Sequence, residues 1–154
     1  MRTEFRFPYR PKPSDRGKPG KHTLYPLVPI QLYTSGSRCT SFEALLDSGA
    51  DNVLIPKGSA ELINLQMGKK IGMESASETT ECYEASVGLI IGQVTGDRFD
   101  LGRVDARVPM SDTGKVPPLL GRHPFFQHFE ITFQQYEPRP SYTIRLKDPT
   151  LKRF

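Results

Sequence analysis

The chain has 154 residues, of which 36% are hydrophobic and 25% charged, and its formal net charge is +4. This length suits one domain with its own core, and no apolar run approaches the ~18 residues that a membrane-spanning helix needs. The two cysteines and three histidines match no disulfide framework and no zinc or redox spacing, so no metal and no cofactor are expected.

The positive charge is concentrated at the start of the chain. Residues 1–21 carry seven basic side chains against two acidic ones, a net charge of +5, which leaves −1 for residues 22–154. We therefore predict a basic, proline-rich, flexible arm over residues 1–22 and a single domain over residues 23–154. Because the domain itself is almost neutral, nucleic acid is not expected as a partner. The first residues lack the apolar segment of a secretion signal, which predicts a cytoplasmic protein without membrane contact.

After the arm, the pattern predicts short strands. Residues 24–33 alternate well enough to form a strand, and residues 39–46 return after a turn built of small residues. Residues 52–56 form a further short apolar strand. One or two helical turns are expected at residues 57–63, with Ser59 as a possible N-cap.

The second half continues in the same way. Strands are expected at residues 69–73, 81–92 and 99–110, and the polar segment between the first two is typical of the exposed tip of a long hairpin. The remaining expected elements are a buried strand ended by glycine, a short helix and a closing hairpin, at residues 116–122, 123–129 and 130–146. This order predicts an all-β domain.

One stretch places a carboxylate where an apolar strand ends. It reads LLDSGADNVLIP and covers residues 45–56. An ionised Asp47 is costly to remove from water, so a strand that delivers it and turns at once through Ser48 and Gly49 presents the carboxylate for use. Taken alone, the Asp-Ser-Gly triplet is equally typical of an ordinary capped loop.

Together with Leu-Leu-Gly-Arg at residues 119–122, this stretch resembles the paired signature of the retropepsin-like aspartic proteases. The resemblance covers most of residues 24–146 and implies a closed, barrel-like β domain with one short helix near the C-terminus. It also implies an aspartic endopeptidase that hydrolyses polypeptides as a homodimer, in which Asp47 of each subunit is catalytic and the pair activates a water molecule. The alternative is a catalytically silent peptide-binding or dimerisation module with the same fold.

The resemblance implies roles for neighbouring residues. Ser48 and Gly49 would support the active-site loop, while Gly49, Ala50 and Asp51 would contact substrate. Asp51 would also form a structural ion pair with Arg122. The hairpin tip takes the place of the flap, and its substrate-binding residues would be Met73, Glu74, Ser75, Ala76 and Ser77.

The sequence departs from the family pattern in three places. Ser48 stands where threonine is commoner, and the flap tip lacks the glycine-rich sequence of retroviral flaps. The closing hairpin predicts a dimer interface built from residues 129–146 instead of interleaved chain ends. A second triplet, Asp-Thr-Gly at residues 112–114, has turn residues on both sides and is interpreted as an ordinary turn.

Overall fold

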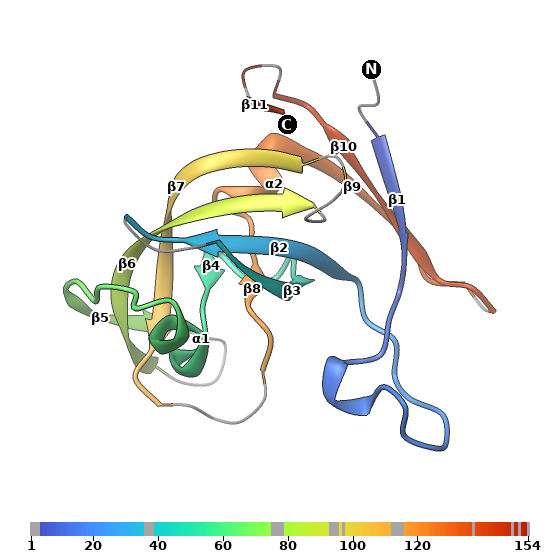
Figure 1. Cartoon of the computed structure of the whole chain (residues 1–154), viewed down its shortest axis with the longest axis horizontal. Coiled ribbons are helices and arrows are strands. Elements are labelled where there is room, and N and C mark those ends of the chain that lie inside the picture. Colours follow the sequence, from blue (N-terminus) through green and yellow to red (C-terminus); the bar gives the residue numbers. More distant parts are fainter. Residues whose placement is uncertain are drawn as a thin grey trace.

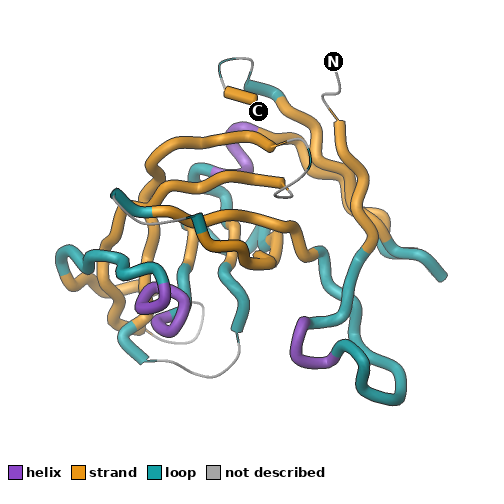
Figure 2. Tube along the Cα trace, in the orientation of Figure 1, coloured by secondary structure: helices purple, strands orange, loops and turns teal. Residues whose placement is uncertain are grey.

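The computed structural model is built mostly of β-strands (Figures 1 and 2), which confirms the all-β prediction. It describes residues 4–35, 39–74, 79–92, 96, 98–111, 116–136, 138–148, 150 and 152–153. The elements are, in chain order, β1 (Glu4–Pro8), the 3-10 helix η1 (Pro13–Asp15), β2 (Leu27–Tyr33), β3 (Thr40–Leu46), β4 (Val53–Leu54), α1 (Lys57–Leu62), β5 (Lys70–Glu74), β6 (Thr79–Gly92), β7 (Arg98–Pro109), β8 (Leu119–Leu120), α2 (Phe125–His128), β9 (Phe129–Gln134), β10 (Ser141–Leu146) and β11 (Lys152–Arg153). Within the described residues, no helix has the length and apolar character needed to cross a membrane.

Six strands close into a barrel. Their order is β7-β4-β8-β3-β2-β6, and the pairing of β6 with β7 completes the ring. Most neighbours are antiparallel, but β3 runs parallel to β8 and β4 runs parallel to β7. Since parallel neighbours cannot be joined by a tight turn, the chain forms β4, β5, β6 and β7 after β3 and pairs with β3 again only at β8. The closed barrel that the sequence predicted is confirmed.

The core of the barrel follows from the alternation of side chains along its strands. Val28, Ile30 and Leu32 of β2 are at most 1% exposed, and Val87 and Leu89 of β6 are fully buried. Strands β2 and β6 are antiparallel neighbours, so these residues meet inside the ring. Burying each such side chain stabilises the fold by about 1.5–3 kcal/mol before conformational entropy is counted.

Several elements differ in detail from the predictions. Helix α1 begins at Lys57 after Pro56, and no side chain caps it, so Ser59 lies inside the helix and its predicted N-cap role is wrong. Strand β8 has only two residues, although the apolar sequence predicted a longer one. Strand β4 also has two residues, and each of the two short strands pairs with neighbours on both sides.

The arm is the largest departure. Strand β1 pairs antiparallel with β10, from Glu4 opposite Arg145 to Pro8 opposite Ser141, and extends the β9–β10 hairpin into a three-stranded sheet beside the barrel (Figure 1). The ring of Phe7 stacks on that of Tyr142 with 5.4 Å between centroids. The structure therefore folds part of the expected flexible arm onto the domain.

The rest of the arm is tied to the barrel by polar contacts. Arg10 and Tyr25 exchange backbone hydrogen bonds of 2.9 and 2.8 Å. The carboxylate of Glu43 on β3 accepts hydrogen bonds from Arg10, at 2.8 Å, and from Arg16. These contacts hold the turn around η1 against the outside of β2 and β3.

Candidate active site

Residues 47–52, between β3 and β4, form the loop that carries Asp47, the Asp loop, and it begins where β3 ends beside the parallel strand β8. Leu45 and Leu46 at the end of β3 pair with Leu119 and Leu120 of β8. One residue further on, the backbone N–H of Asp47 donates to the carbonyl of Leu120 at 3.0 Å. The barrel thus fixes the backbone of Asp47, and the chain turns away from β3 directly after it.

The loop is held by the segment that follows β8. The N–H of Arg122 donates to the carbonyl of Ala50 at 2.8 Å, and the N–H of His123 donates to the carbonyl of Asp51, also at 2.8 Å. Gly121 lies so close to the loop that a Cβ there would be 2.5 Å from the carbonyl oxygens of both Ala50 and Asn52. The structure therefore brings the two halves of the motif into direct backbone contact, and this contact has room only for glycine.

The side chain of Asp47 is half-buried. Its Oδ1 atom accepts a hydrogen bond of 2.9 Å from the N–H of Gly49, and the N–H of Ala50 donates to the Asp47 carbonyl at 3.2 Å. Among the described residues, Gly49 is the only hydrogen-bond donor to this carboxylate. Ser48 and Gly49 are exposed, so the loop presents the carboxylate and its glycine at the surface of a single chain.

Asp51 and Arg122 form an ion pair on the same loop. The Oδ1 atom of Asp51 accepts a hydrogen bond from Nη2 of Arg122. The side chains are 68% and 60% exposed, respectively, so water screens the pair and its contribution to stability in one chain is at most about 1 kcal/mol. The pair joins the Asp loop to the segment after β8.

The long hairpin expected as the flap is formed by β5 and β6. Met73 pairs with Thr80, and Glu74 pairs with Thr79 at the last described rung. Met73 is half-buried and Glu74 exposed. No hydrogen bond joins these described flap residues to the Asp loop. The predicted substrate-binding residues Ser75, Ala76 and Ser77 lie outside the described residues, as does the second triplet at residues 112–114.

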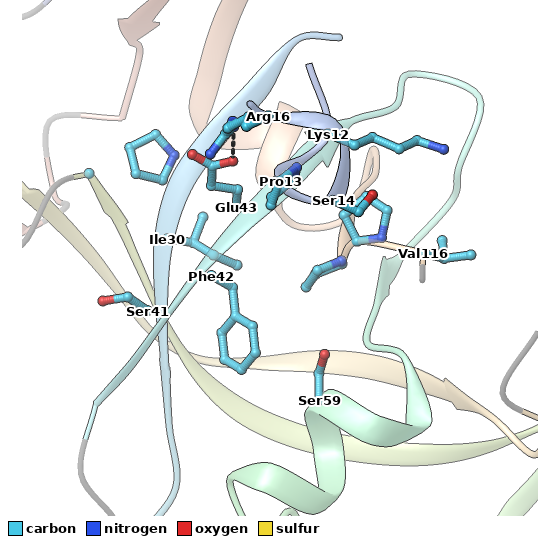
Figure 3. Close-up of a pocket in the computed structure, with 14 residues that line it drawn as sticks. Lys12, Pro13, Ser14, Arg16, Ile30, Ser41, Phe42, Glu43, Ser59 and Val116 are labelled. Carbon is cyan, nitrogen blue, oxygen red and sulfur yellow. Dashed lines mark hydrogen bonds and ion pairs between the residues drawn. The ribbon is translucent and has the colours of Figure 1, made fainter. Parts of the chain in front are cut away.

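A cavity of about 650 Å³ lies between the arm and the barrel, and none of the residues that line it belongs to the Asp loop (Figure 3). Lys12 and Arg16 of the arm, Phe42 and Glu43 of β3, and Val116 contribute to its wall. The sequence analysis missed this cavity because its lining residues come from six separate segments of the chain. Excess basic charge in the arm and a lone acidic residue in β3 were the only signals available.

Within the described part of the chain, no three His, Cys, Asp or Glu side chains gather in a group that could hold a metal ion. Cys39 is exposed and Cys82 is buried, and both are free thiols. Burial raises the pKa of the Cys82 thiol, which keeps it protonated and unreactive.

Comparison with known proteins identifies the fold. No protein-family model and no curated protein matches the sequence. Among solved structures, the chain is similar to a retropepsin-like aspartic protease from Rickettsia conorii, with a TM-score of 0.52 and 11% identity over 93% of this chain and 94% of that one. It also matches the EIAV protease in complex with the inhibitor HBY-793, with a TM-score of 0.46 and 18% identity over 67% of this chain and 86% of that one. The similarity to the first of these structures shows that the chain has the retropepsin-like fold.

Proposed function

We propose that the chain is an aspartic endopeptidase that acts as a homodimer, with one Asp47 from each subunit in a shared active site. The observation that supports this most is the position of Asp47. In a barrel with the retropepsin-like fold, its backbone is fixed by Leu120 and its carboxylate receives one hydrogen bond from the adjoining turn. A single such loop supplies one carboxylate, and the aspartic-protease mechanism needs one carboxylate as base and a second as acid, which is the reason for proposing a dimer.

The proposed reaction uses the two carboxylates in different protonation states. Facing carboxylates cannot both ionise, so the pair holds one proton. The ionised Asp47 removes a proton from a bound water, and the resulting hydroxide attacks the carbonyl carbon of the substrate. The protonated Asp47 gives its proton to the carbonyl oxygen. The Asp47 that took the proton from water then gives it to the amide nitrogen, while the other Asp47 takes a proton from one hydroxyl of the tetrahedral diol. The C–N bond breaks, an amine and a carboxylic acid are released, and the pair again holds one proton.

Other residues of the loop have supporting roles in this proposal. Ser48 and Gly49 hold the loop in place, and the backbone of Gly49 and Ala50 is accessible to an extended substrate strand. Asp51 would bind substrate main-chain groups while its ion pair with Arg122 supports the loop. The flap, including Met73, Glu74, Ser75, Ala76 and Ser77, would cover the substrate. A cytoplasmic location remains a prediction of the sequence.

The test is cleavage of an unstructured protein from about pH 3 to pH 7, with and without pepstatin. Wild-type protein should cleave, and Asp47→Asn should abolish cleavage because an amide cannot take a proton from water. Asp112→Asn is the matched control, since it removes the carboxylate of the other triplet, and it should leave cleavage nearly intact. Tight peptide binding without cleavage by the wild type would instead favour the silent binding module.

The dimer has its own test. Sedimentation velocity over a range of concentrations should detect a species of twice the mass, and the specific activity should rise with the dimeric fraction. The interface proposed for this dimer is the hairpin of residues 129–146, whose β9 strand is at the edge of its sheet and exposes Phe133 (37%). A strictly monomeric protein that cleaves with undiminished specific activity on dilution would contradict the shared site.

A further inference from the structure

The cavity between the arm and the barrel has an apolar wall and a charged rim, and the rim consists of Lys12, Arg16 and Glu43. Ile30, Phe42, Val116 and Pro117 supply the apolar part of its wall. Figure 3 shows Lys12 and Arg16 near η1 on one side, with Phe42 and Ser59 toward the other side. A volume of about 650 Å³ is large enough for several side chains of a peptide.

The charges of this rim do not cancel. The carboxylate of Glu43 is shared by two cations, Arg10 and Arg16. Within the described residues, Lys12 forms no ion pair, and its ammonium lies over the ring of Tyr25, 5.1 Å from the centroid. The Nε atom of Arg16 is buried without a hydrogen-bond partner. The rim thus has an excess of positive charge, which suits an anionic group.

The cavity and Asp47 lie along the same pair of segments. Ser41 and Glu43 of β3 line the cavity. The strand ends at Leu46, and Asp47 is the next residue. The segment before β8 runs beside it in the same direction, because the N–H of Leu45 donates to the carbonyl of Pro118 at 2.8 Å. Glu43 and Asp47 are four residues apart, or about 13 Å at ~3.3 Å per residue of extended chain.

We propose that this cavity is a substrate subsite that selects an acidic side chain in the peptide to be cleaved. The inference rests on the proposed protease function and adds to it the class of substrate. An extended peptide advances by the same ~3.3 Å per residue, so the acidic residue should stand about three to five residues from the scissile bond. Apolar side chains next to it would pack against Phe42 and Val116.

The acidic side chain would be recognised chiefly by Lys12. Arg16 already binds Glu43 and its Nε atom is buried, so it contributes only through its charge. An ion pair at a partly exposed rim changes affinity by only a few fold, and salt screens it. The expected preference for glutamate over glutamine is therefore about threefold at low ionic strength, and it should shrink as salt is added.

The experiment begins with a mixed peptide library digested by the full wild-type chain, with cleavage sites identified by mass spectrometry. Aspartate and glutamate should be enriched about three to five residues from the cut. A cleaved peptide is then made with glutamate or glutamine at the enriched position, and kcat/KM is measured near pH 6, where a glutamate of ordinary pKa, about 4.3, is ionised. The ratio of the two values is the readout.

Three variants test the assignment to the cavity. Lys12→Ala should bring the glutamate-to-glutamine ratio close to one, and Lys12→Glu should make the glutamine peptide the better substrate. Lys18→Ala is the matched control, because it removes the same charge from the arm at a residue that does not line the cavity. It should leave the ratio unchanged.

The outcomes separate this inference from the proposed function. Cleavage with no acidic preference, or with a preference that Lys12→Ala and Lys18→Ala reduce equally, would overturn the subsite and leave the protease intact. If the wild type cleaves no peptide, both the subsite and the proposed protease function are overturned. A preference removed by Lys12→Ala alone, with the cleavage of glutamine peptides retained, supports the subsite.

Discussion

Gly121→Ala is the substitution that most directly tests how the Asp loop is held. The new Cβ would stand 2.5 Å from the carbonyl oxygens of Ala50 and Asn52, and 2.9 Å from the carbonyl carbon of Ala50. These are backbone atoms, so no side chain can rotate away to make room. Either the loop or the segment after β8 must move, and the bond from the N–H of Arg122 to Ala50 joins the two.

The expected loss of stability has two parts. Overpacking in a well-packed region costs about 1–3 kcal/mol. Displacing the Ala50 carbonyl weakens a backbone hydrogen bond worth about 0.5–1.5 kcal/mol. We therefore expect the free energy of unfolding to fall by about 2–4 kcal/mol. At about 2–4 °C per kcal/mol for a domain of this size, Tm should drop by roughly 4–16 °C.

The assay is thermal unfolding followed by circular dichroism, with urea unfolding to give the free energy. Gly72→Ala is the matched control, because its Cβ would meet only the Cγ2 atom of Thr79 at 3.5 Å, an ordinary contact. Its Tm should stay within about 2 °C of the wild type. If Gly121→Ala unfolds at the same temperature as this control, the close packing of loop and strand is not what holds Asp47.

Two further predictions concern strand β10 and the segment that follows it. The hydroxyl of Tyr142 donates to the carbonyl of Leu27 at 2.6 Å in a buried position, so Tyr142→Phe should lower the free energy of unfolding by about 1–3 kcal/mol in urea titrations, and an unchanged value would show that the bond is dispensable. Hydrogen bonds from the hydroxyl and the N–H of Thr150 lower the pKa of Asp148, with a smaller contribution from His128. A lowered pKa in the folded state means that the stabilisation is present above the unfolded pKa of about 3.9 and is lost as the pH falls through the folded value. Thr150→Val should move the carboxyl titration of Asp148 upward in an NMR experiment, and a curve that does not move would rule out the hydroxyl as the main cause.

The strands of the barrel were predictable because their signals are local, whereas its closure was implied only by the family resemblance. Alternation along residues 24–33 and the turn before residues 39–46 fix a hairpin with little reference to the rest of the chain. The end of β3 at Leu46 was also predictable, since a charged residue cannot continue a buried strand. What local pattern could not give was the length of β4 and β8, because it depends on the strands on either side of them.

The arm shows the opposite case. Phe5, Phe7 and Tyr9 recur with the period of a strand, but arginines and prolines between them suggested an unfolded segment. Strand β1 has only five residues, and its partner β10 lies more than 130 residues further along the chain. Such a pairing depends on burying Phe7 and Tyr9 against Tyr142, which no local pattern reveals. The cavity was missed for the same reason.

The position of Asp47 follows from topology more than from its own sequence. Because β3 and β8 are parallel, whatever residue comes after Leu46 must leave the barrel beside the end of β8. The local sequence then decides what is presented there: a carboxylate, a serine and a glycine in place of apolar residues. The arm is fastened to the same strand through Glu43, four residues earlier, so the only strand that delivers Asp47 also anchors the rim of the cavity. A substitution that breaks the ion pairs of Glu43 with Arg10 and Arg16 should therefore change the proposed choice of peptide more than it changes the position of the Asp47 carboxylate.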